Sequence, residues 1–214
     1  SRGALFGVGG VGGHCAEALI RTGVGHLLLV DGDTVVESNL NRQAVAYRST
    51  IGRGKAEAMR ERLLDINPAC DIEEKNLFFD QSTADSIDFS AFDYVIDAID
   101  TVSAKLLLVE RARAAGTPIL CCMGTGNKLD PTSLRISAIE KTSVCPLCRV
   151  MRRELRARGI AGVRVLWSDE SPCVPIQQLS ENGRHPPGSV SFVPPVAGMI
   201  LAGQVVRELA GLAG

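Results

Sequence analysis

The chain has 214 residues, of which 45% are hydrophobic and 22% charged, a composition that suits a folded protein with one sizeable core. Its formal net charge of -1 excludes a globally basic nucleic-acid binder, so any nucleic-acid surface must be local. Seven cysteines, an odd number at irregular positions with no charged and apolar leader before them, argue against a secreted disulfide framework and favour a reduced, cytoplasmic protein.

Short apolar runs bounded by glycine, proline or polar residues predict a series of strands in the first half of the chain. These runs are residues 4–8, 27–30, 72–76, 94–97 and 119–123. Segments with helical periodicity lie between them, at residues 12–22, 53–66 and 104–115. Because strands and helices alternate, we expect an α/β fold with a Rossmann-like, doubly wound and mainly parallel sheet.

The second half of the chain is expected to elaborate the same domain, which would then span residues 1–214. After a connection at 124–131, a strand is predicted at 134–138 and a helix at 145–158. Residues 168–189 are rich in Ser, Pro and Gly, which is typical of a long functional or mobile loop. Residues 193–206 form the longest apolar stretch, but it falls short of the roughly 18 residues of a membrane span. We read it as a buried helix.

A glycine-rich segment lies between the first predicted strand and the first predicted helix. Its glycines at Gly7, Gly9, Gly10 and Gly12 leave backbone amides at the helix N-terminus free to face a phosphate. Such a segment is typical of a nucleotide cradle. The competing interpretation is that the glycines serve only a tight turn.

Two carboxylates at the end of the second predicted strand strengthen the nucleotide interpretation. Asp31 follows the glycine segment at about the spacing expected for a carboxylate that accepts hydrogen bonds from ribose hydroxyls. Asp33 follows two residues later. The alternative for Asp31 is a surface cap. The fingerprint by itself does not separate ATP from a dinucleotide, so a nicotinamide or flavin dehydrogenase remains open at this point.

Two cations and a third carboxylate favour a triphosphate. Arg42 and Lys55 fall near the phosphate end of the expected pocket, where charge on a pyrophosphate leaving group needs fixed cations and usually magnesium. Asp100 follows the fourth strand at the carboxyl edge of the sheet, where a hard cation finds oxygen ligands. Taken singly, the cations could make weak surface ion pairs and Asp100 could cap a helix.

These motifs resemble the ATP-binding domain of the ubiquitin-activating, or E1-like, adenylating superfamily over nearly the whole chain. The match consists of the glycine segment, the Asp31-Gly32-Asp33 pair, the Asn39-Leu40-Asn41-Arg42-Gln43 segment, Lys55 and Asp100. The resemblance implies that Gly10 lies against phosphate and that Asp31 holds ribose. It further implies that Asn39, Arg42 and Lys55 contact the phosphates and act in catalysis, with Gln43 and Asp33 in the same nucleotide site. Asp100 would bind Mg²⁺.

One branch of this superfamily, the tRNA threonylcarbamoyladenosine dehydratases, is matched by four further segments. They are residues 94–100, 126–132, 141–147 and 191–198. This resemblance implies adenylation of the carboxylate of a threonylcarbamoyl group on an adenosine beside the anticodon, followed by ring closure that expels AMP. The alternative is an enzyme that activates the C-terminal carboxylate of a ubiquitin-like sulfur-carrier protein.

The resemblance also implies a homodimer with no membrane association, and it leaves a sulfur-relay partner open. Members of the family usually carry an N-terminal helical segment with an arginine that reaches the neighbouring subunit's ATP. In this sequence Ser1 lies almost inside the first predicted strand, so that segment is expected to be absent.

Cysteine spacing bears on the sulfur-carrier alternative, whose members commonly hold structural zinc with two Cys-x-x-Cys pairs. This chain has one such pair, Cys145 and Cys148, while Cys121 and Cys122 are adjacent and Cys173 is solitary. We therefore do not expect zinc. Cys173 is a candidate thiolate nucleophile, but an inert small hydrophobic residue is the favoured reading.

The predicted helix at residues 145–158 offers a local tRNA-binding surface in a protein without excess positive charge. Arg149, Arg152, Arg153 and Arg156 recur at i, i+3, i+4 and i+7, which places them on one helical face. Arginine suits the task because its planar fork grips phosphate oxygens in pairs. The alternatives are a solvated face neutralised by Glu154 and other carboxylates, or a subunit interface.

Overall fold

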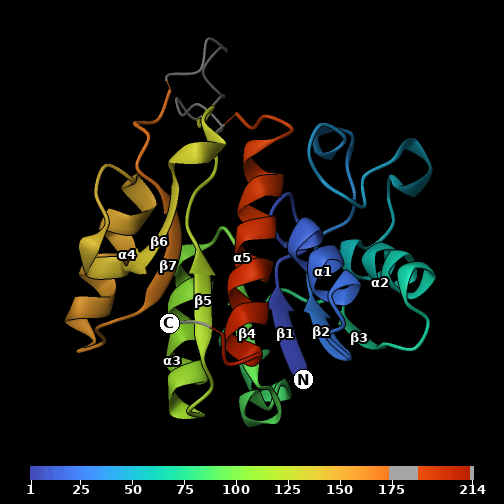
Figure 1. The fold of residues 1–214 in the computed structure, drawn as a ribbon, viewed down its shortest axis with the longest axis horizontal. Helices are drawn as coiled ribbons and strands as arrows, with labels where there is room; N and C mark the ends of the chain where they lie inside the picture. The colour runs from blue at the N-terminus through green and yellow to red at the C-terminus, as the bar shows by residue number, and fades with distance from the viewer. Residues whose placement is uncertain (174–187, 213–214) are drawn as a thin grey trace.

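The computed structural model describes residues 1–173 and 188–212 and is built around a seven-stranded sheet (Figure 1). The strands are β1 (Arg2–Phe6), β2 (His26–Val30), β3 (Asp71–Lys75), β4 (Tyr94–Asp97), β5 (Ile119–Cys122), β6 (Leu134–Ala138) and β7 (Arg164–Ser168). Their order is β3-β2-β1-β4-β5-β7-β6, with every pair parallel except β6 and β7. The prediction of a Rossmann-like, mainly parallel sheet is confirmed.

Helices cover both faces of this sheet. They are α1 (Gly12–Arg21), α2 (Lys55–Ile66), α3 (Val102–Ala114), α4 (Pro146–Ala157) and α5 (Val193–Leu209). Helices α1, α2 and α5 pack on one face, where Leu5 and Leu29 belong to their core. Helices α3 and α4 cover the other face, and α5 lies across the front of the sheet in Figure 1. Burial on both faces explains why β1 and β2 read as continuous apolar runs.

The strand order creates a switch point at the carboxyl end of β1. The chain leaves β1 through α1 to β2 on one side, while β4 pairs with β1 on the other side. Connections that run in opposite directions from neighbouring strands leave a crevice between them, which is where open α/β sheets bind ligands. The glycine segment, Asp31 and Asp100 all follow strands at this edge.

Element boundaries differ from the prediction in a few places. The first strand stops at Phe6 rather than residue 8, because Gly7 turns the chain with a φ of 90°, in the region that favours glycine. Strand β7 was not predicted, and it pairs between β5 and β6. Of the predicted loop at 168–189, residues 174–187 lie outside the described residues.

The apolar stretch at the end of the chain is a helix, as predicted. Helix α5 buries Val193, Ala197, Leu201 and Val205 against the core. Over the described part of the chain, none of the helices combines the length and apolar character that crossing a membrane requires.

Candidate nucleotide-binding site

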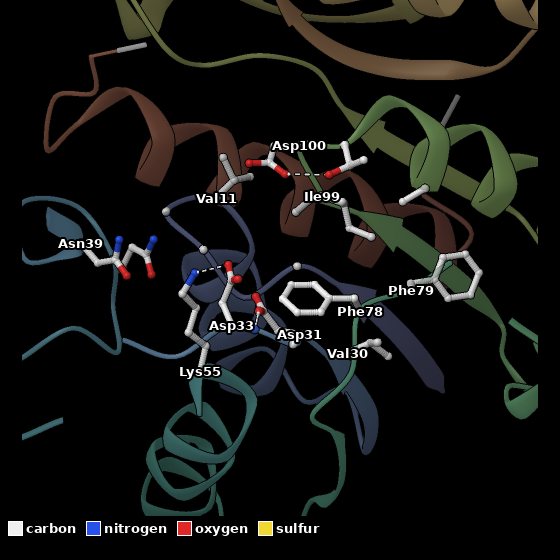
Figure 2. Close-up of a pocket in the computed structure, with 18 of the residues that line it drawn as sticks. Val11, Val30, Asp31, Asp33, Asn39, Lys55, Phe78, Phe79, Ile99 and Asp100 are labelled. Carbon is white, nitrogen blue, oxygen red and sulfur yellow. Dashed lines mark hydrogen bonds and ion pairs between the residues drawn. The ribbon is translucent and has the colours of Figure 1, made fainter. Parts of the chain in front are cut away.

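A cavity of about 700 Å³ opens at the carboxyl edge of β1, β2 and β4 (Figure 2). It brings together residues that are far apart in the sequence but that the motifs placed in one site. Those that line it are Gly7, Gly9, Gly10, Asp31, Asp33, Asn39, Arg42, Gln43, Lys55 and Asp100. Gly12 is the one predicted nucleotide residue that does not line it.

The glycines of the segment have different structural roles. A Cβ on Gly12 would lie 1.8 Å from the carbonyl oxygen of Gly7, and one on Gly7 would lie 2.7 Å from the oxygen of Ala98. Glycine at these two positions lets the backbone of the turn pack closely against itself and against the backbone that follows β4. A Cβ on Gly9 would meet nothing closer than 3.8 Å, so packing does not require glycine there and the space beside its backbone is open.

Asp31 is fixed by the backbone at the mouth of the crevice. Its Oδ2 accepts from the Val8 amide at 2.6 Å, and its Oδ1 accepts from the Asp33 amide at 2.8 Å. Burial raises the pKa of this carboxyl above its ordinary value, although the two amides and Lys55 oppose the rise. The carboxylate therefore sits in a defined orientation, with lone pairs left for further donors.

Lys55 is held inside the pocket by its partner Asp33. Its Nζ lies 2.7 Å from Asp33 Oδ2, and its own amide donates to the Asp33 carbonyl at 2.9 Å (Figure 2). The lysine side chain is 8% exposed, whereas the carboxylate is 53% exposed. A buried ammonium at the first residue of α2 is thus aimed into the cavity from the side of the sheet that carries β2.

Three polar residues of the segment after β2 complete this wall. Asn39 is buried and accepts from the Val36 amide through Oδ1 at 3.2 Å. Arg42 is steadied by Ser38 and Asn41, to which its Nη1 donates at 2.9 Å each. Gln43 is 8% exposed, and within the described residues its Oε1 is the one buried side-chain oxygen or nitrogen that lacks a partner. An unpaired buried amide oxygen at a cavity wall is a group that a ligand can satisfy.

Asp100 stands on the opposite wall and is exposed (Figure 2). Its Oδ1 accepts from the Thr101 hydroxyl at 3.3 Å. Among the described residues, the one group of three or more metal-ligand side chains lies elsewhere and consists of His26, Asp71 and Glu73. A hard cation at Asp100 would therefore take most of its oxygen ligands from a bound phosphate and water.

An aromatic side chain that the sequence reading missed lies at the rim. Phe78 lines the cavity and is 65% exposed, and a Cβ on Gly32 would lie 2.8 Å from its ring. Figure 2 shows the ring near Asp31. An exposed ring beside the expected ribose carboxylate offers a stacking face for a base. No periodicity distinguishes Phe78 from Phe79, which instead packs in the core against Phe6.

The four arginines expected to share one face of the helix have different surroundings in the structure. Arg149, Arg153 and Arg156 are exposed on α4. Arg152 is half-buried, and its Nη1 donates to the carbonyl and the hydroxyl of Thr142 at 2.8 and 2.7 Å. Arg153 is exposed but pairs with Glu154 at 2.8 Å. The four arginines therefore do not form one uniform free face, because Arg152 ties α4 to the preceding turn. The apolar side of the helix packs on the domain through Cys148, Met151 and Leu155.

The cysteines also take distinct positions. Cys145 and Cys148 are buried at the start of α4, and Cys121 and Cys122 are buried in β5. Cys173 is half-buried, and its amide donates to the Asn127 carbonyl at 2.8 Å.

The sheet order, the glycine turn and the polar cavity, which Arg42 and Lys55 line, define a Rossmann-like fold of the nucleotide-binding class. The comparison with family models gives the particular family: a ThiF family model matches residues 1–213. The chain belongs to the ThiF family, as the E1-like resemblance predicted.

Individual relatives agree with this assignment. A Bacillus subtilis (strain 168) protein named tRNA threonylcarbamoyladenosine dehydratase is 42% identical over 217 residues, covering 96% of this chain and 85% of the relative. The crystal structure of the Escherichia coli tRNA N6-threonylcarbamoyladenosine dehydratase in complex with AMP matches with a TM-score of 0.89 at 31% identity. The same enzyme in complex with ATP matches with a TM-score of 0.87. Both solved structures match 99% of this chain and 86% of their own.

Proposed function

We propose that this chain is an ATP-dependent tRNA threonylcarbamoyladenosine dehydratase. It adenylates the carboxylate of the threonylcarbamoyl group on a tRNA adenosine beside the anticodon and promotes the ring closure that releases AMP. The observation that carries the proposal is the convergence of Arg42, Lys55 and Asp100 on one cavity of a chain 42% identical to such an enzyme.

The cavity supports a definite placement of ATP. The glycine amides and the cations Arg42 and Lys55 are proposed to hold the phosphates, and Asp31 the ribose hydroxyls. Phe78 is proposed to stack on the adenine. Gln43 Oε1 would gain a donor from the nucleotide or its water shell, which removes the cost of an unpaired buried oxygen.

The chemistry then needs little beyond positioning and charge. The substrate carboxylate oxygen attacks the α-phosphorus, and the bond to pyrophosphate breaks. Arg42 and Lys55 stabilise the negative charge that builds on the leaving group. A nitrogen or oxygen of the carbamoyl group next attacks the activated carboxyl carbon and releases its proton to solvent, so that the acyl–phosphate bond breaks, AMP leaves and the ring closes. The net change is the loss of one water from the nucleoside, driven by ATP cleavage to AMP and pyrophosphate.

Magnesium is proposed to bind at Asp100. The exposed carboxylate fits a hard cation, and Mg²⁺ there would neutralise phosphate charge. Zinc is not part of the proposal.

The tRNA is proposed to approach over α4. Arg149, Arg153 and Arg156 give an exposed basic face, and Arg153 also lines a second groove of about 550 Å³ between α3 and α4. That groove shares Asp80, Ser103 and Ala104 with the nucleotide cavity. A nucleic acid that rests on α4 would thus have a continuous path to the site of adenylation.

The assembly and surroundings are proposed from the family resemblance. We propose a cytoplasmic homodimer in which the chain acts as one adenylating domain, and a sulfur-relay partner remains a secondary proposal. Two exposed apolar side chains of α5, Phe192 at its N-cap and Met199 further along the helix, support a subunit contact.

One assay tests the function against its alternative. The purified chain with ATP and Mg²⁺ is given either tRNA that carries the threonylcarbamoyl mark or a carrier protein that ends in a Gly-Gly carboxylate. AMP release that depends on the tRNA, with loss of one water from the digested nucleoside, is the expected result. Release supported by the carrier alone would assign the chain to carrier activation instead, and tight NAD binding without AMP release would exclude both.

A further inference from the structure

The guanidinium of Arg42 divides its donors between the protein and the nucleotide cavity. Its Nη1 donates to the Ser38 carbonyl and to Asn41 Oδ1, and these two bonds use both hydrogens of that nitrogen. Within residues 1–173 and 188–212, neither Nε nor Nη2 of Arg42 forms a hydrogen bond. Three N–H groups therefore remain for a ligand in the cavity that Arg42 lines.

The rest of the Arg42 side chain is packed beside the glycine expected at the phosphate. A Cβ on Gly10 would lie 3.2 Å from Arg42 Cγ and 3.2 Å from Pro194 Cβ. The Arg42 backbone is fixed as well, since its amide donates to the Asn39 carbonyl at 3.1 Å and its carbonyl accepts from His14 Nε2 at 3.2 Å. The guanidinium is thus the part of the residue whose orientation depends on side-chain partners.

The partners of Arg42 differ from those of the other cation in the cavity. Lys55 pairs with the carboxylate of Asp33 at 2.7 Å, so part of its charge is already balanced by the protein. Arg42 is held instead by a carbonyl and an amide oxygen, which are neutral. Neutral acceptors orient the guanidinium and leave its full charge to a phosphate.

Asn41 uses both ends of its side-chain amide. Its Oδ1 accepts from Arg42, and its Nδ2 donates to the carbonyl of Ser189 at 2.8 Å. Only this orientation of the amide suits both partners, because a guanidinium cannot accept and a carbonyl cannot donate. Asn41 is exposed, so packing alone does not fix it. Its orientation, and through it that of Arg42, depends on the position of Ser189.

Asn127 holds this part of the chain from the side of β5. Its amide donates to the Gly188 carbonyl at 2.8 Å, and its Oδ1 accepts from the Gly188 amide at 2.7 Å. Asn127 has a φ of 57°, in the left-handed region that asparagine tolerates better than most residues. A network of hydrogen bonds therefore runs from the turn after β5, through residues 188 and 189, to the wall that follows β2.

Building on the proposed role of Arg42 in holding the phosphates of ATP, we propose that Asn41 is a positioning residue for Arg42. Ser189 orients Asn41, and Asn127 fixes Ser189 through Gly188. With Nη1 engaged by the protein, Nε and Nη2 form the planar fork that grips two phosphate oxygens. A guanidinium that is already oriented loses less freedom when the nucleotide binds, so the network strengthens ATP binding without touching ATP.

Nucleotide affinity tests the network in the full chain. Calorimetric titration with a non-hydrolysable ATP analogue and Mg²⁺ should show Asn41→Ala binding about fivefold more weakly, the order of one lost hydrogen bond. Asn127→Gly accepts the positive φ but removes Oδ1, so it should weaken binding in the same direction. Thermal unfolding checks that each variant is folded.

Asn67→Ala is the matched control. It also removes a hydrogen bond from an asparagine side chain to the backbone, in this case to the Ala69 amide at 3.2 Å. Asn67 is the C-cap of α2 and does not line the cavity, so this variant should bind the analogue as the unmodified chain does.

A double-substitution cycle separates positioning from an independent effect. In an Arg42→Ala background, Asn41→Ala and Asn127→Gly should cause no further loss of affinity, because the side chain that they orient is gone. Losses that multiply in the combined variants would overturn the proposal. So would full affinity in Asn41→Ala while Arg42→Ala binds weakly, a result that leaves the proposed role of Arg42 intact. Full affinity in Arg42→Ala would remove that role and, with it, the need for a positioning residue.

Discussion

Lys105 and Asp97 form an ion pair that is entirely buried beneath the nucleotide cavity. The Lys105 Nζ lies 3.0 Å from Asp97 Oδ2, and both side chains are 0% exposed. Nζ also donates to the Cys122 carbonyl at 2.6 Å, while Asp97 Oδ1 accepts from the Ile99 amide at 3.1 Å. The pair thus links α3 and β5 to the turn that ends in Asp100.

Removal of one partner should be costly. Burial is the largest effect and would lower the pKa of Lys105, but Asp97, Cys121 and Cys122 together outweigh it and raise the pKa, so the ammonium is retained. Lys105→Met leaves Asp97 buried without its counter-ion and should lower the free energy of unfolding by about 3–5 kcal/mol, measured by denaturant titration. The double variant Lys105→Met with Asp97→Asn removes both charges and should be less destabilised than the single variant. Equal losses in both would show that the charge pair is not the cause.

Two residues on opposite walls of the cavity should affect turnover without affecting the fold. Asp100→Asn and Arg42→Ala are each expected to lower ATP-dependent turnover by about 100-fold or more, because each removes a contact to charge that develops on the phosphates. AMP release checks turnover, and circular dichroism checks the fold. Unchanged turnover in both variants would refute the assignment.

The glycines of the cradle offer a matched pair of substitutions. Gly12→Ala would place a methyl group 1.8 Å from the Gly7 oxygen, so it should destabilise the protein by several kcal/mol or prevent folding. Gly9→Ala has no neighbour closer than 3.8 Å and should leave the unfolding free energy within about 1 kcal/mol. ATP binding by Gly9→Ala should nevertheless weaken, because the methyl group enters the space for phosphate. Calorimetric titration and thermal unfolding separate the two effects, and normal ATP affinity of Gly9→Ala would argue against phosphate at this amide.

The carboxylates predicted for the nucleotide site line one cavity because they follow strands that a parallel sheet aligns at one edge. Asp31 comes directly after a predicted strand, and Asp100 comes three residues after the end of another. The partner of Arg152 could not be predicted, because periodicity gives the face of a helix but not what each side chain contacts, here Thr142. Lys105 was missed for a related reason, since a lysine within α3 reads as a solvated charge until the end of β4 and the Cys122 carbonyl are brought around it.

Glu17 should make the free energy of unfolding depend on pH. It joins α1 to α2 through ion pairs with Arg21 and Arg62, both at 2.8 Å. Burial would raise the pKa of Glu17, but the two arginines outweigh it and hold the pKa below its ordinary value of 4.5. A depressed carboxyl pKa stabilises the fold above the unfolded value, and this stability is lost as the pH falls below about 4.5. Glu17→Gln should cost about 1 kcal/mol at pH 7, and urea titrations should show the difference shrinking below pH 4.5. A constant difference across this range would exclude the ion pairs as its source.

The exposed arginines of α4 provide the test of tRNA docking. Arg149, Arg153 and Arg156 are exposed, so replacing all three with alanine removes up to three phosphate contacts while the buried side of α4 stays intact. The triple variant should bind tRNA more weakly, and its salt dependence should flatten by about three charge equivalents, with ATP affinity unchanged. Filter binding at several salt concentrations measures both quantities.

Arg152→Ala is the matched control on the same helix. Its guanidinium is engaged with Thr142, so the substitution should lower the unfolding free energy by about 1–2 kcal/mol, the cost of charge-assisted hydrogen bonds, and leave the salt slope of tRNA binding as it was. The opposite pattern, with an altered slope in Arg152→Ala and an unaltered one in the triple variant, would place the tRNA on the side of α4 that faces Thr142. If neither variant changes the slope, α4 does not carry the phosphates, and Glu154, which pairs with Arg153 at 2.8 Å, would then account for the arginines as a neutralised, solvated face.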